Sequence, residues 1–250
     1  MNGEWSGKPD YEFAKLVEEG LEYEEKLLQD KFLKPIKITD VAIKKIPYIA
    51  YPGLNKEECM ELLELERKLL TIAKNENLSR EVAITVRLDK ENFINNEDRI
   101  AIAMGNDYEV DVYNDTKSFH LLRSANDIVV INMHNHPRGS TFSTNDITFF
   151  LREAKIRILI LLSNKGKIEF LTRKDTYDYN ECIRLLANAT RTIAKNRFTK
   201  KNKLLVEQLS VKERIKIAKL WLKEIHQYGL IYGIANNYVK KEVKTNEYHR

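Results

Sequence analysis

The chain reads IVVINMHNHP from Ile128 to Pro137, and this stretch decides the fold that we expect. Its apolar first half favours a buried strand, and Pro137 ends that strand because proline has no N–H to offer the ladder. Side chains alternate between the two faces of a strand, so His134 and His136 are expected on the same face, where one metal ion could bind both. Asp146 follows after a loop, in the first turn of a predicted helix and within reach of the same point.

Two imidazoles and one carboxylate are typical of a catalytic zinc site, because a tetrahedral ion then keeps its fourth position for water. We therefore predict that His134, His136 and Asp146 are zinc ligands. Ser143, three residues before Asp146, has two interpretations that stay open. It can be the N-cap of the helix, paired with the acid at the third helical position, and it can help to hold an oxyanion.

His-x-His-Pro at a strand end, followed by Ser-x-x-Asp at the start of a helix, resembles the JAMM (MPN-type) zinc metalloprotease family. The wording HNHP is also similar to the bacterial RadC-like branch and to the JAB-domain proteins of phages and mobile elements. The resemblance covers roughly residues 56–173, and its loop at residues 138–142 is one residue shorter than is usual in the family. It implies an MPN/JAB-like fold with cytidine-deaminase-like layers, a Zn²⁺ cofactor, and hydrolysis of peptide or isopeptide bonds in a protein or peptide substrate.

The same family places a catalytic glutamate at the start of a strand that follows a helix, and Glu81 matches this context. Leucines at helical spacing predict a helix at residues 55–74, and residues 81–86 favour a strand. A carboxylate at this place would take a proton from water and return it to the leaving amine. The alternative is that Glu81 is a solvated charge at a strand end. Three other acids lie in polar stretches with no strand to hold them: Glu76, Glu91 and Glu97.

Other zinc scaffolds fit the chain less well. A zinc deaminase needs a Pro-Cys-x-x-Cys motif, whereas Cys59 and Cys182 are far apart in this sequence. A His-Glu-x-x-His helix is absent, and His120 has no spacing that pairs it with the motif. About 115 residues follow the motif, which is too few for the rest of a typical β/α barrel.

Composition favours a cytoplasmic protein with no membrane segment. The chain of 250 residues holds no apolar run near the ~20 residues that cross a bilayer, and its N-terminus does not read as a signal peptide. Two isolated cysteines form no disulfide framework, as expected in a reducing compartment.

Positive charge gathers in the last part of the chain. Residues 184–250 hold 16 Lys and Arg against 5 Asp and Glu, whereas the whole chain has a net charge of +5. Such a segment could bind nucleic acid, an acidic partner or the acidic N-terminal helix of the same chain, but the commonest explanation is a solvated helical face. The alternative function is therefore a non-catalytic or RadC-like accessory protein of a mobile element or phage, which contacts nucleic acid or a protein partner.

These patterns predict an α/β fold with a mixed β-sheet flanked by helices and with helical extensions at both ends. We expect an N-terminal acidic helix (10–31) and an extended linker or edge strand (32–54) in residues 1–54, a JAMM-like catalytic domain at 55–183, and a basic helical extension at 184–250. Further elements are predicted in the central part: strands at 99–104, 109–113, 156–162 and 167–172, and helices at 116–124 and 147–154.

Overall fold

A computed structural model describes residues 35–194 and 211–235 of the chain. In these ranges a sheet is built from β1 (Val82–Arg87), β2 (Ile100–Met104), β3 (Val130–His136), β4 (Ile156–Ser163), β5 (Ile168–Arg173) and β6 (Leu230–Ala235). The helices are α2 (Asp40–Lys44), α3 (Lys56–Asn75), α4 (Thr116–Ser124), α5 (Thr144–Arg152), α6 (Tyr179–Ile193) and α7 (Val211–Glu224), with short 3-10 turns η1 (Lys90–Asn92) and η3 (Ile225–Tyr228).

The six strands form one open mixed sheet in the order β2-β1-β3-β4-β5-β6. Only the central pair, β3 and β4, is parallel, and every other neighbouring pair is antiparallel. Parallel neighbours need a crossover, and α5 supplies it between β3 and β4. The predicted α/β class, a mixed sheet flanked by helices, is confirmed.

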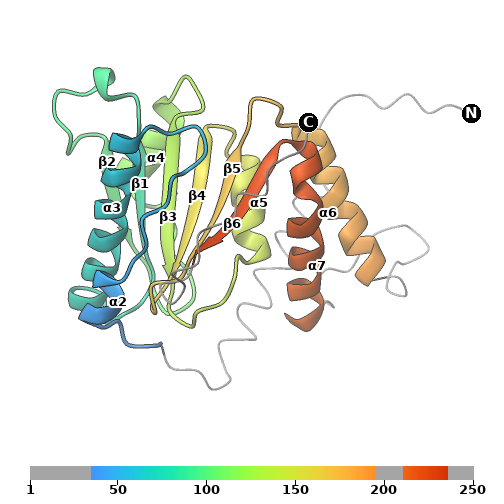
Figure 1. The fold of residues 1–250 in the computed structure, drawn as a ribbon, viewed down its shortest axis with the longest axis horizontal. Helices are drawn as coiled ribbons and strands as arrows, with labels where there is room; N and C mark the ends of the chain where they lie inside the picture. The colour runs from blue at the N-terminus through green and yellow to red at the C-terminus, as the bar shows by residue number, and fades with distance from the viewer. Residues whose placement is uncertain (1–34, 195–210, 236–250) are drawn as a thin grey trace, which may run out of the picture.

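Helices cover both faces of the sheet (Figure 1). On one face, apolar residues of α3 pack against one side of the central strands, and this core includes Leu69, Ile84, Met133 and Ile160. On the other face the cover comes from α4, α5, α6 and α7, which pack against Ala83, Leu159, Leu161 and Leu171. Because both faces are covered, β3 and β4 are almost continuously buried, which explains their long apolar runs.

Three predictions about elements need correction. The stretch at 109–113 is no strand, because the Asp111 carboxylate accepts hydrogen bonds from the N–H groups of Tyr113 and Asn114 and so forms a turn. In the part predicted as an extended linker or edge strand, residues 40–44 form α2 and no strand occurs among the described residues 35–54. The C-terminal part, expected to be helical, also contributes β6 to the sheet. The acidic helix predicted at residues 10–31 lies outside the described residues.

One end of the sheet collects the elements that matter for the site. β1 begins there, β3 and β4 end there, and α5 begins there, at the lower end of the molecule in Figure 1. Crevices at the carboxyl ends of parallel strands are common binding places in open α/β sheets. No helix in the described ranges has both the length and the apolar character that a membrane span requires.

Candidate metal centre

The end of β3 brings the two histidines together. His134 pairs with Ala83 of β1 on one side and with Leu161 of β4 on the other, so the backbone here is held from both edges. His134 is 5% exposed and His136 is 7% exposed, and their Nε2 atoms lie 3.2 Å apart. The two rings therefore point to one place, as the alternation of strand side chains predicts.

The first turn of α5 brings the carboxylate. Ser143 is the N-cap, and its hydroxyl oxygen accepts a hydrogen bond from the Asp146 N–H at 3.1 Å. Asp146 answers from the third helical position, because its Oδ2 accepts from the Ser143 N–H at 2.6 Å. This reciprocal capping box fixes the direction of the Asp146 side chain toward the histidines. The predicted capping role of Ser143 is confirmed, whereas its role at an oxyanion stays a prediction.

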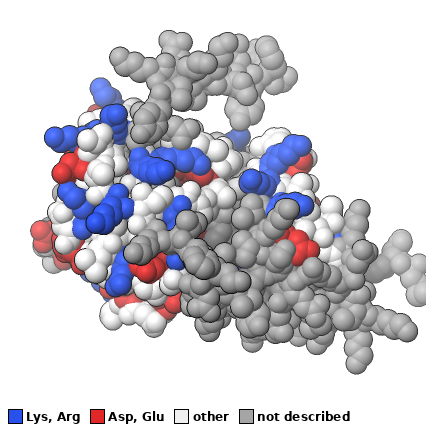
Figure 2. Space-filling view, turned by 90° about the horizontal axis from the view of Figure 1, so that it is seen from below, with Lys and Arg blue, Asp and Glu red and all other residues white. Residues whose placement is uncertain are grey.

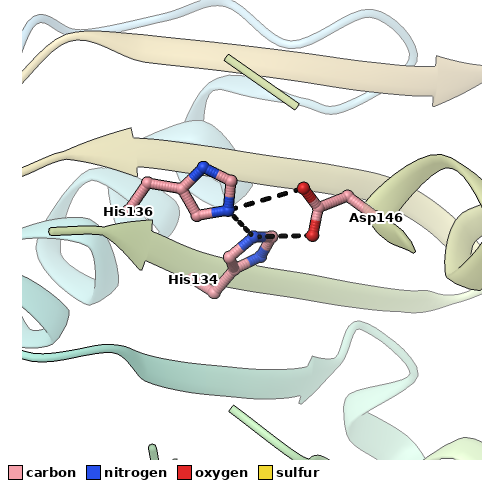
Figure 3. A group of neighbouring side chains, drawn as sticks. All are labelled: His134, His136 and Asp146. Carbon is pink, nitrogen blue, oxygen red and sulfur yellow. Dashed lines mark hydrogen bonds and ion pairs between the residues drawn. The ribbon is translucent and has the colours of Figure 1, made fainter. Parts of the chain in front are cut away.

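The three side chains converge on one point between β3 and α5 (Figure 3). Asp146 Oδ1 lies 3.1 Å from His134 Nε2, and Asp146 Oδ2 lies 3.4 Å from His136 Nε2. A tetrahedral ion with ligand bonds of about 2.0–2.1 Å places its ligand atoms about 3.3 Å from one another. The observed separations are close to that edge length, with each imidazole nearest to a different oxygen of Asp146, so the group fits a metal ion. Among the described residues, these three form the one group of three or more His, Cys, Asp or Glu side chains whose ligand atoms lie close enough to share an ion.

A neighbouring hydroxyl orients one of the rings. Ser140 Oγ lies 2.8 Å from His136 Nδ1, on the side of the imidazole that faces away from the convergence point. A partner on the outer nitrogen selects the tautomer and leaves Nε2 available to a metal.

The charge states also suit metal binding. Burial lowers the pKa of His136 to about 4, although the negative charge of Asp146 opposes this shift. His136 is therefore neutral at pH 7, which is the form that binds metals. Burial by itself would raise the pKa of Asp146, but the two imidazoles and the hydrogen bonds it accepts outweigh burial and hold the pKa well below its usual value. Asp146 is an ionised ligand as a result.

Glu81 lies beside this group rather than in it. The residue precedes β1, is 6% exposed, and pairs through its main chain with the segment after β2: its N–H donates to Asn106 O and its carbonyl accepts from Gly105 N–H, both at 2.9 Å. Ala83, two residues later, is the register partner of His134. Strand alternation places Glu81 on the same face as Ala83 and hence on the face of the histidines.

The rival glutamates lie in less suitable places. Glu91 belongs to η1 and Glu97 precedes β2, so both are at the opposite end of β1 from the histidines. Glu76 is the exposed C-cap residue of α3. Of the four acids considered from sequence, Glu81 alone is buried at the end of the sheet where the ligands converge.

Sequence reasoning missed Glu169 on β5. This residue is 2% exposed and shares the face of Leu161, its register partner, which in turn pairs with His134. Its carboxylate accepts hydrogen bonds from Thr141 Oγ1 at 2.5 Å and Tyr232 Oη at 2.7 Å, and it pairs with Lys167. The network ties the loop between β3 and α5 to the far strands. A glutamate inside the apolar run of β5 was the signal that could have revealed it.

Comparisons of the chain with protein-family models, with curated proteins and with solved structures found no match. The candidate centre is therefore defined by the positions and chemistry of its own side chains.

Proposed function

We propose that this chain is a zinc-dependent hydrolase of peptide or isopeptide bonds, of the JAMM (MPN-type) kind. The observation that carries the proposal is the convergence of His134, His136 and Asp146 with the edge lengths of a tetrahedral metal site. Three ligands from the protein leave a fourth position open, which is typical of catalytic zinc. The parallel β3–β4 pair with helices on both faces supports an MPN/JAB-like arrangement.

A zinc ion held by these three side chains would polarise the scissile carbonyl and lower the pKa of a nearby water. Glu81 then accepts a proton from the attacking water while the water oxygen adds to the carbonyl carbon. Glu81 next delivers this proton to the amide nitrogen, the C–N bond breaks, and the products are a carboxylate and an amine. The Ser143 hydroxyl proton is free to turn toward the oxygen that gains negative charge, because the cap uses only the hydroxyl oxygen.

The direct test is metal content. Protein purified without added metal should contain about one zinc per chain by elemental analysis. The double substitution His134→Ala/His136→Ala should abolish binding, whereas His120→Ala, which changes an exposed histidine on α4, should leave it intact. Stoichiometric zinc in the double variant would overturn the assignment of ligands.

The reaction is tested separately with a library of peptides and isopeptide-linked lysine conjugates. Cleavage should require zinc and should be lost on chelation and restored when zinc is added back. A protein that binds zinc at this site but cleaves no member of the library would favour the alternative, a non-catalytic accessory protein that keeps the fold for interaction.

A further inference from the structure

The residue between the two candidate ligands holds the main chain on both sides of Glu81. Asn135 is 0% exposed, and its Oδ1 accepts a hydrogen bond from the Val82 N–H at 2.8 Å. Its Nδ2 donates to the Arg80 carbonyl at 3.1 Å. These two groups belong to the peptide units before and after Glu81. One carboxamide thus clamps the backbone from which the Glu81 side chain departs.

The clamp begins where ordinary strand pairing stops. The register between β1 and β3 runs as far as Ala83 and His134. Beyond that pair, the Val82 N–H donates to the Asn135 side chain instead of to a backbone carbonyl of β3. On the other edge, the segment after β2 binds the N–H and the carbonyl of Glu81. The main chain of Glu81 is consequently fixed from two sides, by β3 through a side chain and by the β2 segment through its backbone.

A second buried amide holds Asn135 itself. Asn135 Nδ2 also donates to Asn164 Oδ1 at 2.8 Å, and Asn164 is 1% exposed. Asn164 Nδ2 donates in turn to the carbonyls of Ile36 at 2.7 Å and Ser79 at 2.8 Å. A carboxamide whose donors and acceptor are all engaged has one orientation, so the clamp on Glu81 is rigid.

The turn that leads to Glu81 needs such support. Leu78 and Ser79 have φ angles of 53° and 64°, in the left-handed region that non-glycine residues rarely adopt. Two consecutive residues of this kind persist only where surrounding contacts determine them. Asn164 binds the Ser79 carbonyl, and the Ser79 hydroxyl accepts from the Ile38 N–H at 3.1 Å.

We propose that Asn135 is a positioning residue that sets the place of the Glu81 carboxylate relative to the metal ligands. The inference rests on the function proposed above. A general base must stand within about 2.6–3.2 Å of the oxygen whose proton it takes, and a misplacement of about 1 Å can cost about 10²-fold in rate. Because His134, Asn135 and His136 are consecutive, one short piece of β3 carries both the candidate ligands and the amide that holds the Glu81 main chain. The position of Glu81 is therefore fixed relative to the metal ligands.

The test uses cobalt in place of zinc, because the visible absorption of bound Co²⁺ reports on its surroundings without a substrate. The variants are Asn135→Ala and, as the reference for a lost base, Glu81→Gln. Asn132→Ala is the matched control: Asn132 is also a buried β3 amide that reaches β1, donating to Thr85 Oγ1 at 3.0 Å, but it is remote from Glu81. Each protein is checked for folding by thermal unfolding, for one Co²⁺ per chain, and for the pH midpoint of its absorption change.

Glu81→Gln should shift the pH midpoint of the Co²⁺ absorption change by about one pH unit toward lower pH, because it removes a nearby negative charge. Asn135→Ala should bind one Co²⁺ and shift the midpoint in the same direction. Asn132→Ala should keep the midpoint of the unaltered protein even though it unfolds at a lower temperature. Once a cleaved peptide is known, Asn135→Ala should lower kcat by about 10²-fold with little change in KM.

Asn164→Ala is measured in parallel, so that the proposal does not depend on the folding of one variant. It removes the amide that orients Asn135, and a smaller shift in the same direction is expected. Unchanged midpoints in the folded Asn135 and Asn164 variants, beside a shifted Glu81→Gln, would overturn the positioning role alone. Failure of the unaltered protein to bind Co²⁺ would instead overturn the proposed function and this inference with it.

Discussion

Two of the three candidate metal ligands, His136 and Asp146, have a partner outside the group that limits their freedom. Ser140 holds the outer nitrogen of the His136 ring, and the Ser143 N–H holds one oxygen of Asp146. Such partners fix the tautomer and the direction of a ligand before any ion arrives. The site is therefore preorganised by single side chains and backbone groups within about ten residues of β3.

Glu81→Gln tests the proposed base at this scale. The amide keeps the shape of the acid but cannot accept a proton from water, so hydrolysis should fall by about 10²–10⁴-fold while zinc stays bound. Turnover of a cleaved peptide and zinc content are measured together. Glu76→Gln, at an exposed helix end, should change neither quantity. Equal losses in the two variants would contradict the assignment of Glu81.

Glu66 predicts a pH dependence of stability that is separate from the metal site. Burial raises its pKa to about 8, even though the Tyr51 hydroxyl, which donates to Glu66 at 2.5 Å, acts to lower it. Between pH 4.5 and about 8 the unfolded chain loses this proton while the folded chain keeps it. The free energy of unfolding should therefore fall as pH rises through this window, at on the order of 1 kcal/mol per pH unit.

Urea unfolding at several pH values between 5 and 9 measures this effect. Glu66→Gln mimics the protonated acid, so it should remove the part of the pH dependence of the free energy of unfolding that Glu66 causes. Glu64→Gln, at an exposed position on the same helix, should leave that pH dependence unchanged. Parallel pH profiles for the unaltered protein and Glu66→Gln would contradict the raised pKa.

At the scale of elements, N-terminal caps determine where the helices α3 and α5 begin. α3 starts with a capping box between Asn55 and Glu58, and α5 starts with one between Ser143 and Asp146. Both starts are legible in the sequence because capping is local. The turn at Asp111 is local too, but the residues around it also have a strand-like pattern, and side-chain hydrogen bonds to the backbone decided in favour of the turn.

Ser143→Ala tests whether a cap also serves the metal. Loss of the cap should lower the free energy of unfolding by about 1 kcal/mol, and zinc affinity should fall because Asp146 is held less firmly. Asp115→Ala removes the equivalent cap of α4, where the carboxylate accepts from the Ser118 N–H at 2.7 Å. It should lower stability to a similar degree without changing zinc affinity. Activity of Ser143→Ala should fall less than that of Glu81→Gln.

At the scale of the whole molecule, residues 211–235, the described C-terminal range, are part of the folded body. Trp221 of α7 is 0% exposed and its Nε1 donates to the Cys182 carbonyl at 2.9 Å, while β6 pairs with β5. A truncation after Ala194 would remove these contacts from the core. Surface substitutions are therefore the right way to examine the positive charge of this region.

Basic side chains are also prominent at the end of the molecule where the candidate centre lies. Figure 2 looks onto this end, and Lys and Arg side chains gather on the described surface there with fewer acidic ones between them. On α7, Lys216, Lys219 and Lys223 are exposed and follow one another at helical spacing. Such a stripe suits a polyanionic partner.

Replacing these three lysines by glutamine tests that partner. If nucleic acid binds along α7, the substitution should weaken binding and should reduce the slope of log affinity against log salt by about 3, because three phosphate contacts are lost. Titrations of labelled single- and double-stranded DNA at several salt concentrations measure both effects. A control set of exposed lysines on α2 and α3, Lys44, Lys56 and Lys68, should have no effect when changed to glutamine. Equal effects of the two sets would contradict a binding role for α7.

The sequence by itself determined the candidate ligands and the elements that carry them. Strand alternation, the stop at Pro137 and the cap at Ser143 act over a few residues, so the pattern from Ile128 to Asp146 could be interpreted without knowledge of the rest of the chain. The mixed α/β sheet followed from the alternation of strands and helices. Whether these residues hold zinc and cut a peptide bond stays a prediction.

Only the tertiary structure decided how the distant pieces meet. Which strands become neighbours determines three features of the site. These are the short distance between His134 and Asp146, the hydrogen bonds between Asn135 and the main chain around Glu81, and the pairing of Glu169 with Leu161 beside β3. The addition of β6 depends on the same choice. Strand pairing joins segments tens of residues apart, and its free energy comes from burying both faces of the sheet together. No short stretch of sequence therefore contains the information that selects the neighbouring strands.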